Sequence, residues 1–267
     1  MNLSQAAVVL RKRTPLEVVE LSLLFLRGVR PDLSRRLAAI TLVPLFVGGL
    51  ALRYFLDWSW GVILPVFLVL SWLIELPYVV LAGQALFDQE IRLRAVLTGS
   101  MQRLLPFAAV LLFQVAVIAA LLLTVVGPLF AMATYCFAIE AVCLERATAR
   151  QGLRRARNLL RGRSGSGIQT VFLRGCLMVS CVLTSEVLGQ ALWSYVLDIG
   201  VESESLMDSG GSPFALFGLL ASVPLTSYYR FLSYINERTI LDGWDIQVAF
   251  LSLAKDSPTM PVAEAAE

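Results

Sequence analysis

Residues 104–144 read LLPFAAVLLFQVAVIAALLLTVVGPLFAMATYCFAIEAVCL, and this stretch decides the fold class. Glu140 is its single charged residue, and Gly127 and Pro128 divide it into two apolar blocks. Each block holds 17 residues or more, enough to cross a ~30 Å hydrocarbon core as a helix that rises 1.5 Å per residue. Because a chain in lipid must satisfy its own backbone hydrogen bonds, both blocks are predicted to be transmembrane helices.

The same pattern recurs along the whole chain. Hydrophobic residues make up 57% of the 267 residues and charged residues 16%, a composition typical of membrane proteins rather than of soluble domains. Six apolar blocks follow one another, at 37–56, 60–82, 104–126, 128–144, 171–197 and 213–235. The predicted fold is therefore all-α, a polytopic bundle of six transmembrane helices with short amphipathic interfacial helices. It forms one membrane domain over 1–267, with an interfacial N-terminus (1–36), the six-helix bundle (37–235) and a tail (236–267).

The charges between the blocks alternate in sign. Basic residues crowd 1–36 and 145–170, whereas 198–212 carries acidic residues and no basic one. Since Lys and Arg accumulate in cytoplasmic loops, both termini are predicted to be cytoplasmic. Only Lys12 and Lys255 among the 22 basic residues are lysine, a bias that points weakly to a GC-rich bacterial genome. The expected location is the inner membrane of a bacterium.

Two amphipathic helices are predicted beside the spans. Thr14, Pro15 and Glu17 have the pattern of a capping box with proline at the first helical position, so a helix should begin there. It is interpreted either as a helix on the cytoplasmic leaflet or as a helix packed over the bundle. Residues 83–103 are predicted to form a second such helix.

A cluster of arginines follows the fourth block. Its members recur every three or four residues, which predicts one stripe along a helix continuing from that block. The stripe consists of Arg146, Arg150, Arg154, Arg157 and Arg161. Juxtamembrane arginines attract anionic lipid at ~1 kcal/mol per residue, and they could equally bind an acidic partner. The alternative is a topology anchor with no further role.

Charged residues within or near the ends of the spans are costly unless they face the bundle interior. Five such residues are Glu75, Glu140, Arg174, Glu186 and Arg230. Counting along the helices puts Glu75, Glu140 and Arg230 in the inner half of the membrane, and Arg174 either lies at a similar depth or extends its side chain to the surface. We expect a cluster in which a glutamate pairs with an arginine, and we favour a structural ion pair over a proton or ion relay. Glu186 stands apart, without an obvious partner.

Several kinds of chemistry have no support in the sequence. The chain contains no histidine, and its four cysteines form no CxxC pair. Neither a nucleophile beside a base nor a cluster of metal ligands can be assigned. We therefore expect no catalytic residue, no metal and no cofactor. The partners that we expect are membrane lipids and other protein subunits, not nucleic acid.

Two stretches resemble a known family. Residues 142–145 (VCLE) with 152–162 (GLRRARNLLRG), and 236–238 (NER) with 242–246 (DGWDI), are similar to motifs of one bacterial group. These are the membrane proteins related to the membrane domain of glycerophosphoryl diester phosphodiesterases. The sequence departs from their pattern at Ala156, where serine is usual, and at Leu241 and Asp242, which replace a basic residue and a glutamate.

The resemblance implies a membrane domain without catalytic residues. It implies that Glu145 belongs to a cytoplasmic elbow with the arginines from Arg155 to Arg161. It also implies a turn in the tail, formed by Asp242, Gly243, Trp244 and Asp245. Relatives often accompany MoxR-type AAA ATPases and transglutaminase-like membrane proteins, which are therefore expected partners.

Two functions follow from these expectations. The first is a non-enzymatic membrane subunit or scaffold that recruits cytoplasmic partners or anionic lipid through its arginine-rich elbow. The alternative is a transporter or channel for a small or lipidic solute that uses the buried glutamates.

Overall fold

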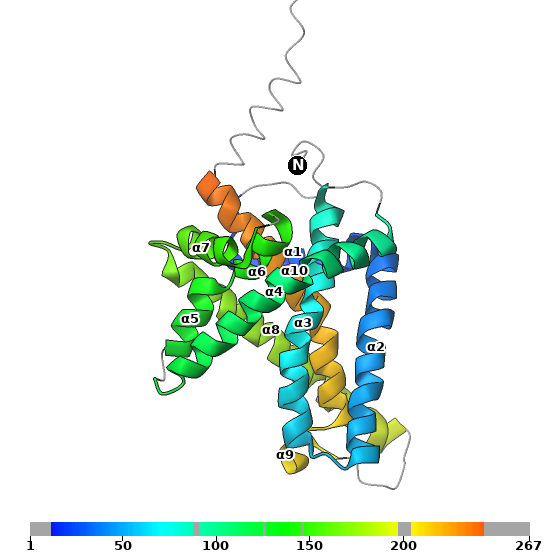
Figure 1. Ribbon diagram of the computed structural model, residues 1–267. Helices are drawn as coiled ribbons and strands as arrows, with labels where there is room; N and C mark the ends of the chain where they lie inside the picture. The colour runs from blue at the N-terminus through cyan, green and yellow to red at the C-terminus, as the bar shows by residue number, and fades with distance from the viewer. Residues whose placement is uncertain (1–11, 88–90, 125–126, 146, 197–203, 243–267) are drawn as a thin grey trace, which may run out of the picture.

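The computed structural model describes residues 12–87, 91–124, 127–145, 147–196 and 204–242 (Figure 1). Helices account for most of these residues. In chain order they are α1 (Pro15–Gly28), α2 (Pro31–Leu56), α3 (Trp60–Phe87), α4 (Leu93–Leu121), α5 (Gly127–Tyr135), α6 (Ala138–Glu145), α7 (Ala149–Leu159), α8 (Ser164–Ala191), α9 (Leu206–Ser209) and α10 (Pro213–Asp242). A π-helical turn, Leu192–Val196, extends α8.

Among the described residues, five helical stretches are long and apolar enough to cross a membrane. They are Pro31–Leu56, Trp60–Leu86, Leu93–Leu121, Gly127–Glu145 and Ser164–Tyr195. The sixth expected span lies in α10, which has sufficient length but carries Arg230 amid Ser, Thr and Tyr residues. The all-helical fold predicted from the sequence is confirmed. The five apolar stretches are compatible with a multi-pass membrane protein, and the count of six crossings stays a prediction.

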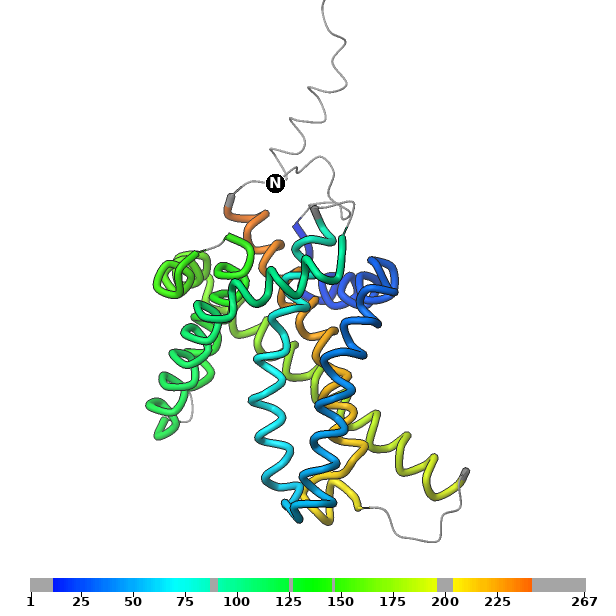
Figure 2. The backbone as a smooth tube through the Cα atoms, turned by 45° about the vertical axis from the view of Figure 1, so that its right-hand side comes forward, coloured from blue at the N-terminus to red at the C-terminus, as the bar shows by residue number. Residues whose placement is uncertain are grey.

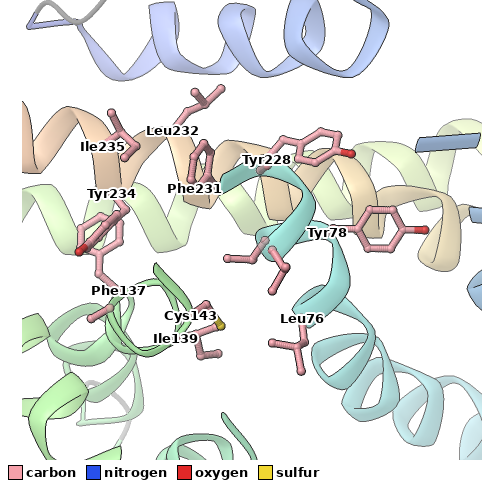
Figure 3. Close-up of a cluster of buried hydrophobic side chains, with 14 of the residues drawn as sticks. Leu76, Tyr78, Phe137, Ile139, Cys143, Tyr228, Phe231, Leu232, Tyr234 and Ile235 are labelled. Carbon is pink, nitrogen blue, oxygen red and sulfur yellow. The ribbon is translucent and has the colours of Figure 1, made fainter. Parts of the chain in front are cut away.

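The polar helix α10 occupies the centre of the bundle. It packs against α1, α2, α3 and α8, and most of its residues from Ala215 onward are buried. Its aromatic residues Tyr228, Phe231 and Tyr234 belong to a core that also contains Tyr78 and Phe137 (Figure 3). The polar side chains of α10 are therefore enclosed by neighbouring helices, which explains why this helix need not be uniformly apolar.

The contact between α8 and α10 depends on a glycine. A Cβ atom at Gly218 would lie 2.7 Å from the carbonyl oxygen of Cys181 and 2.8 Å from the Cβ of Ser185. The absence of a side chain lets the two backbones approach closely, as at other small-residue contacts between membrane helices.

The helices form a column and a side arm. In Figure 2 the column consists of α2, α3 and α10, which run side by side. The helices α4 and α5 lean away from α3 toward the end at which they are joined, and we call them the α4–α5 arm. The helices α1 and α7 lie across one end of the bundle, the end at which α10 finishes (Figure 1).

The expected N-terminal helix is present as α1. Thr14 accepts a hydrogen bond from the amide of Glu17, and the Glu17 carboxylate accepts one from the amide of Thr14 at 2.8 Å. This capping box confirms the predicted start. Val18 and Phe25 pack into the core, and Leu16 stays 71% exposed.

The prediction of a second interfacial helix at 83–103 is wrong. Residues 83–87 complete α3, and α4 begins at Leu93. The close packing of α3 on α6 explains its extension, because a Cβ at Gly83 would lie 2.5 Å from Leu144. This contact gives the last turns of α3 a buried face.

The fourth apolar block is also not one helix, since α5 ends at Tyr135 and α6 begins at Ala138. Gln114 of α4 donates a hydrogen bond to the carbonyl oxygen of Tyr135 at 2.8 Å. This side chain satisfies a backbone group at the break, as lipid surroundings require.

Candidate functional site

Four charged side chains from four helices meet inside the bundle. Arg174 of α8 bonds Glu75 of α3 through Nη2. The other oxygen of Glu75 accepts a hydrogen bond from Nη1 of Arg230 at 2.6 Å. Nε of Arg230, on α10, then donates to Glu140 of α6 at 2.8 Å. The structure thus brings together all four residues that were expected to form the cluster.

The four residues form a linear chain of alternating charge, in the order Arg174, Glu75, Arg230, Glu140. Three of the four are almost fully enclosed, with exposed fractions of 2% for Glu75, 3% for Arg230 and 0% for Glu140. Two positive and two negative charges balance, so the cluster as a whole is neutral. Neutrality and direct hydrogen bonds reduce the cost of burying charge in a medium of low dielectric constant.

The two ends of this charge chain differ. The Arg174 side chain is 20% exposed, and it faces a pocket between α3, α4, α5 and α8. Glu140 is enclosed, and its Oε2 atom has no hydrogen-bond partner within the part of the chain that the structure describes. The Glu140 end of the charge chain is therefore enclosed by protein, and the Arg174 end borders the pocket.

A second group of polar contacts ties the end of α10 to its neighbours. Glu145 at the end of α6 accepts hydrogen bonds from Arg238, at 3.0 Å, and from Tyr234, and it lies 3.4 Å from Nε of Arg155. Glu145 was expected in the elbow only from the family resemblance, and no pattern in the sequence indicated its partners.

A third contact joins the same region of α10 to α8. Glu237 forms an ion pair with Arg163 at 2.8 Å and accepts a hydrogen bond from Ser166 at 2.5 Å. Asn236, next to it, accepts a hydrogen bond from the amide of Arg13 at 2.8 Å. The start of α1, the start of α8 and the end of α10 are thereby held together.

The arginine stripe is shorter than predicted. A new helix, α7, begins after Thr148, whose hydroxyl forms a capping box with Gln151. This cap marks a separate helix start, so α7 does not continue α6. The stripe on α7 therefore comprises Arg150, Arg154 and Arg157. Arg161 follows the end of α7. Arg146 lies outside the described residues.

The helix α7 presents two different faces. Gly152, Ala156 and Leu159 are buried, and a Cβ at Gly152 would lie 2.4 Å from Val142 of α6. Arg150, Arg154 and Arg157 lie on the exposed side. Within the described part of the chain no carboxylate pairs with these three arginines, so their charge is available to another molecule. We call them the α7 arginine face.

At the opposite end of the bundle, acidic residues hold the loop before α10. Glu186, for which no partner was expected, accepts hydrogen bonds from the amide of Leu206 at 2.9 Å and from Ser212. Ser212 in turn accepts one from the amide of Ala215 in the first turn of α10. Gln190, one turn further along α8, also donates a hydrogen bond to Glu186 at 3.1 Å. The expectation was wrong: Leu206 and Ser212 lie 20 or more residues away along the chain, whereas the Gln190 contact has the spacing of neighbours on one helix face.

Glu204 forms a further contact at that end. It bonds Arg53 of α2, and it accepts a hydrogen bond from the indole of Trp60 at 2.5 Å. The hydrogen bond from Arg53 is the main reason that the pKa of Glu204 lies below its usual value.

Little of the expected tail turn falls within the described residues. Asp242 is the last residue of α10. Gly243, Trp244 and Asp245 lie outside the described residues. Among those that are described, no group of three or more Cys, Asp or Glu residues could hold a metal ion.

Comparison of the chain with protein-family models, with curated proteins and with solved structures finds no match. The functional argument therefore depends on the geometry of the site.

Proposed function

We propose that this chain is a non-enzymatic, multi-pass subunit of a bacterial inner-membrane complex, and that it binds acidic partners through the α7 arginine face. The supporting observation is that Arg150, Arg154 and Arg157 are exposed and unpaired within the described chain. The nearby Arg155 and Arg163, in contrast, each have a carboxylate partner. In the proposed topology the chain crosses the membrane six times, with α10 as the sixth crossing.

The position of α10 supports this topology. Its 30 residues correspond to ~45 Å of helix, more than the ~30 Å of a hydrocarbon core. The acidic residues near its start and the arginines near α7 then lie on opposite sides of the membrane. That arrangement agrees with the preference of arginine for the cytoplasmic side.

The chemistry of the α7 arginine face defines the class of acceptor. Three guanidinium groups on one helix face suit carboxylate or phosphate groups, which they can bind by bidentate hydrogen bonds. The acceptor is an acidic protein surface or the anionic lipid of the adjoining leaflet. The family resemblance suggests a MoxR-type AAA ATPase or a transglutaminase-like membrane protein as the protein partner.

The test replaces Arg150, Arg154 and Arg157 with glutamine and compares the proteins and lipids that copurify in mild detergent. The matched control replaces Arg27, Arg35 and Arg36, which are exposed on α1 and α2 at the same end of the bundle. We expect the α7 variant to lose a stoichiometric protein partner or bound anionic lipid, and the control to keep both. An unchanged set of bound molecules in the α7 variant contradicts the proposal.

The transporter hypothesis has weaker support. Both Glu75 and Glu140 are bonded to Arg230, an arrangement suited to joining α3, α6 and α10. Flux through proteoliposomes that stops when Glu75 or Glu140 is neutralised, in a variant of unchanged stability, would favour transport over the scaffold.

A further inference from the structure

A small pocket lies where the α4–α5 arm meets the rest of the bundle. Its volume is about 40 Å³. Its walls are mainly apolar and include Trp72 of α3, Val117 of α4 and Met132 of α5. Arg174 and Arg230 provide its positive charge. The pocket is therefore an apolar site with a cationic end, inside the region of the apolar helices.

Arg174 is the group that can bind a ligand there. A guanidinium has five N–H donors, and within the described chain the single hydrogen-bond partner of Arg174 is Glu75, reached through Nη2. Arg230 differs, because it already contacts Glu75 and Glu140 through three nitrogens. Arg174 thus keeps donors for a further acceptor, and its side chain is 20% exposed.

The size of the pocket limits the acceptor. In this measure a water molecule needs roughly 10–15 Å³, so about 40 Å³ accommodates roughly three water-sized groups. A carboxylate has three non-hydrogen atoms and matches the bidentate geometry of a guanidinium. A phosphate ester group has five and is too large for this volume.

The surroundings determine what carries the carboxylate. Trp72, Val117 and Met132 suit the first carbon atoms of a hydrocarbon chain. The rest of such a chain lies outside the pocket, because a carboxylate already takes up most of its volume of about 40 Å³. The three residues belong to α3, α4 and α5, and in Figure 2 the α4–α5 arm leans away from α3. In a bilayer, acyl chains surround these apolar helices. We propose that the pocket binds a single-chain fatty acid, with its carboxylate on Arg174 and its chain between α3 and the α4–α5 arm.

Trp72 provides a direct readout, because a bromine atom in contact with an indole quenches its fluorescence. The full chain in phosphatidylcholine nanodiscs is titrated with 4,5-dibromostearate, whose bromine atoms lie near the carboxyl group, at alkaline pH, and with the methyl ester of the same acid. The Trp72→Phe variant gives the signal of the other tryptophans, which is subtracted. We expect saturable quenching of Trp72, with the acid effective at concentrations about tenfold lower than the ester because only the acid can accept charge-assisted hydrogen bonds.

Two variants make the test specific. In Arg174→Gln, acid and ester should quench Trp72 equally. In Val117→Phe the added ring fills the pocket, and saturable quenching should disappear. The matched control is Val115→Phe, because Val115 lies on the same helix, is 38% exposed and does not line the pocket.

Equal quenching by acid and ester in the unaltered protein overturns the proposal, and so does an acid preference that survives in Arg174→Gln. If Arg174→Gln does not fold, the comparison of Val117→Phe with Val115→Phe shows whether the acid binds in the pocket. Saturable quenching of Trp72 in both variants contradicts binding there. The result is independent of the α7 arginine face, since none of these residues lies on α7.

Discussion

Arg230 of α10 contacts Glu140 of α6 through two nitrogens of its guanidinium. Nε donates to Oε1 at 2.8 Å, and Nη2 lies 2.5 Å from the same oxygen. Arg230 also bonds Glu75, which has a second partner in Arg174. Glu140 thus depends on Arg230 alone within the described chain, whereas Glu75 has two cationic partners.

This asymmetry predicts an order of stability for three variants. Arg230→Met leaves Glu140 buried without a partner, and it should lower the free energy of unfolding by about 3–5 kcal/mol. Glu140→Leu leaves Arg230 with Glu75 and should cost less. The double variant keeps the balanced pair of Glu75 and Arg174, and it should be more stable than Arg230→Met alone. Unfolding in detergent measures all three, and additive losses in the double variant would show that the two residues are not coupled.

The close contact of α8 and α10 predicts opposite effects of alanine at two glycines. Gly218→Ala places a Cβ 2.7 Å from the carbonyl oxygen of Cys181, so it should destabilise the protein by about 1–3 kcal/mol. Gly175→Ala is the control in α8, where the new Cβ meets no atom within 4 Å. It should be neutral or stabilise by up to about 1 kcal/mol, because alanine favours a helix. Equal melting temperatures for the two variants would contradict the close contact.

The packing of α7 on α6 predicts that binding can be lost without removing any charge. Gly152→Val introduces atoms where a Cβ would already lie 2.4 Å from Val142, so α7 should be displaced from α6. We expect the loss of the molecules that copurify through the α7 arginine face. Gly28→Val, at the same end of the bundle but with no atom within 4 Å of its Cβ, should retain them. Full retention by Gly152→Val would mean that the position of α7 is unimportant for binding.

The Glu204 contact predicts a dependence of stability on pH. The pKa of Glu204 in the folded protein lies below the reference value of 4.5, mainly because Arg53 donates a hydrogen bond to its carboxylate. A lowered pKa in the folded state stabilises the protein above pH 4.5, and that contribution is lost as pH falls toward the lowered value. Glu204→Gln should therefore reduce the melting temperature at pH 7, and the difference from the unaltered protein should shrink below pH 4.5. A difference that is the same at pH 7 and at pH 3.5 would contradict a role for the ionised carboxylate.

The sequence was informative where local chemistry or depth decides the structure. Thr14 and Glu17 identified the start of α1, because a capping box involves neighbouring residues only. Glu75 and Arg230 could be expected to lie together, since unpaired charges at one depth in lipid are costly. The order of the four residues in the charge chain could not be predicted, because that order depends on how α3, α6, α8 and α10 are arranged.

The errors have two origins. The capping box of Thr148 and Gln151 and the contact of Gln190 with Glu186 involve residues three or four apart, so both could have been predicted from the sequence. The break before α6 and the partners of Glu186 in the loop before α10 depend on residues 20 or more positions away, Gln114 and Leu206 among them. Hydrophobic periodicity contains no information on such contacts.

The central claim is that α10, the most polar of the long helices, crosses the membrane. Single cysteines at Ser209 and Leu241 test it most directly, because these exposed positions lie just before and at the end of α10. The four native cysteines are first replaced with alanine, and intact cells are treated with a membrane-impermeant maleimide. We predict that Ser209→Cys reacts on intact cells and that Leu241→Cys reacts only after the membrane is permeabilised. Reaction of both positions from the same side would contradict six crossings and the sidedness of every surface described above.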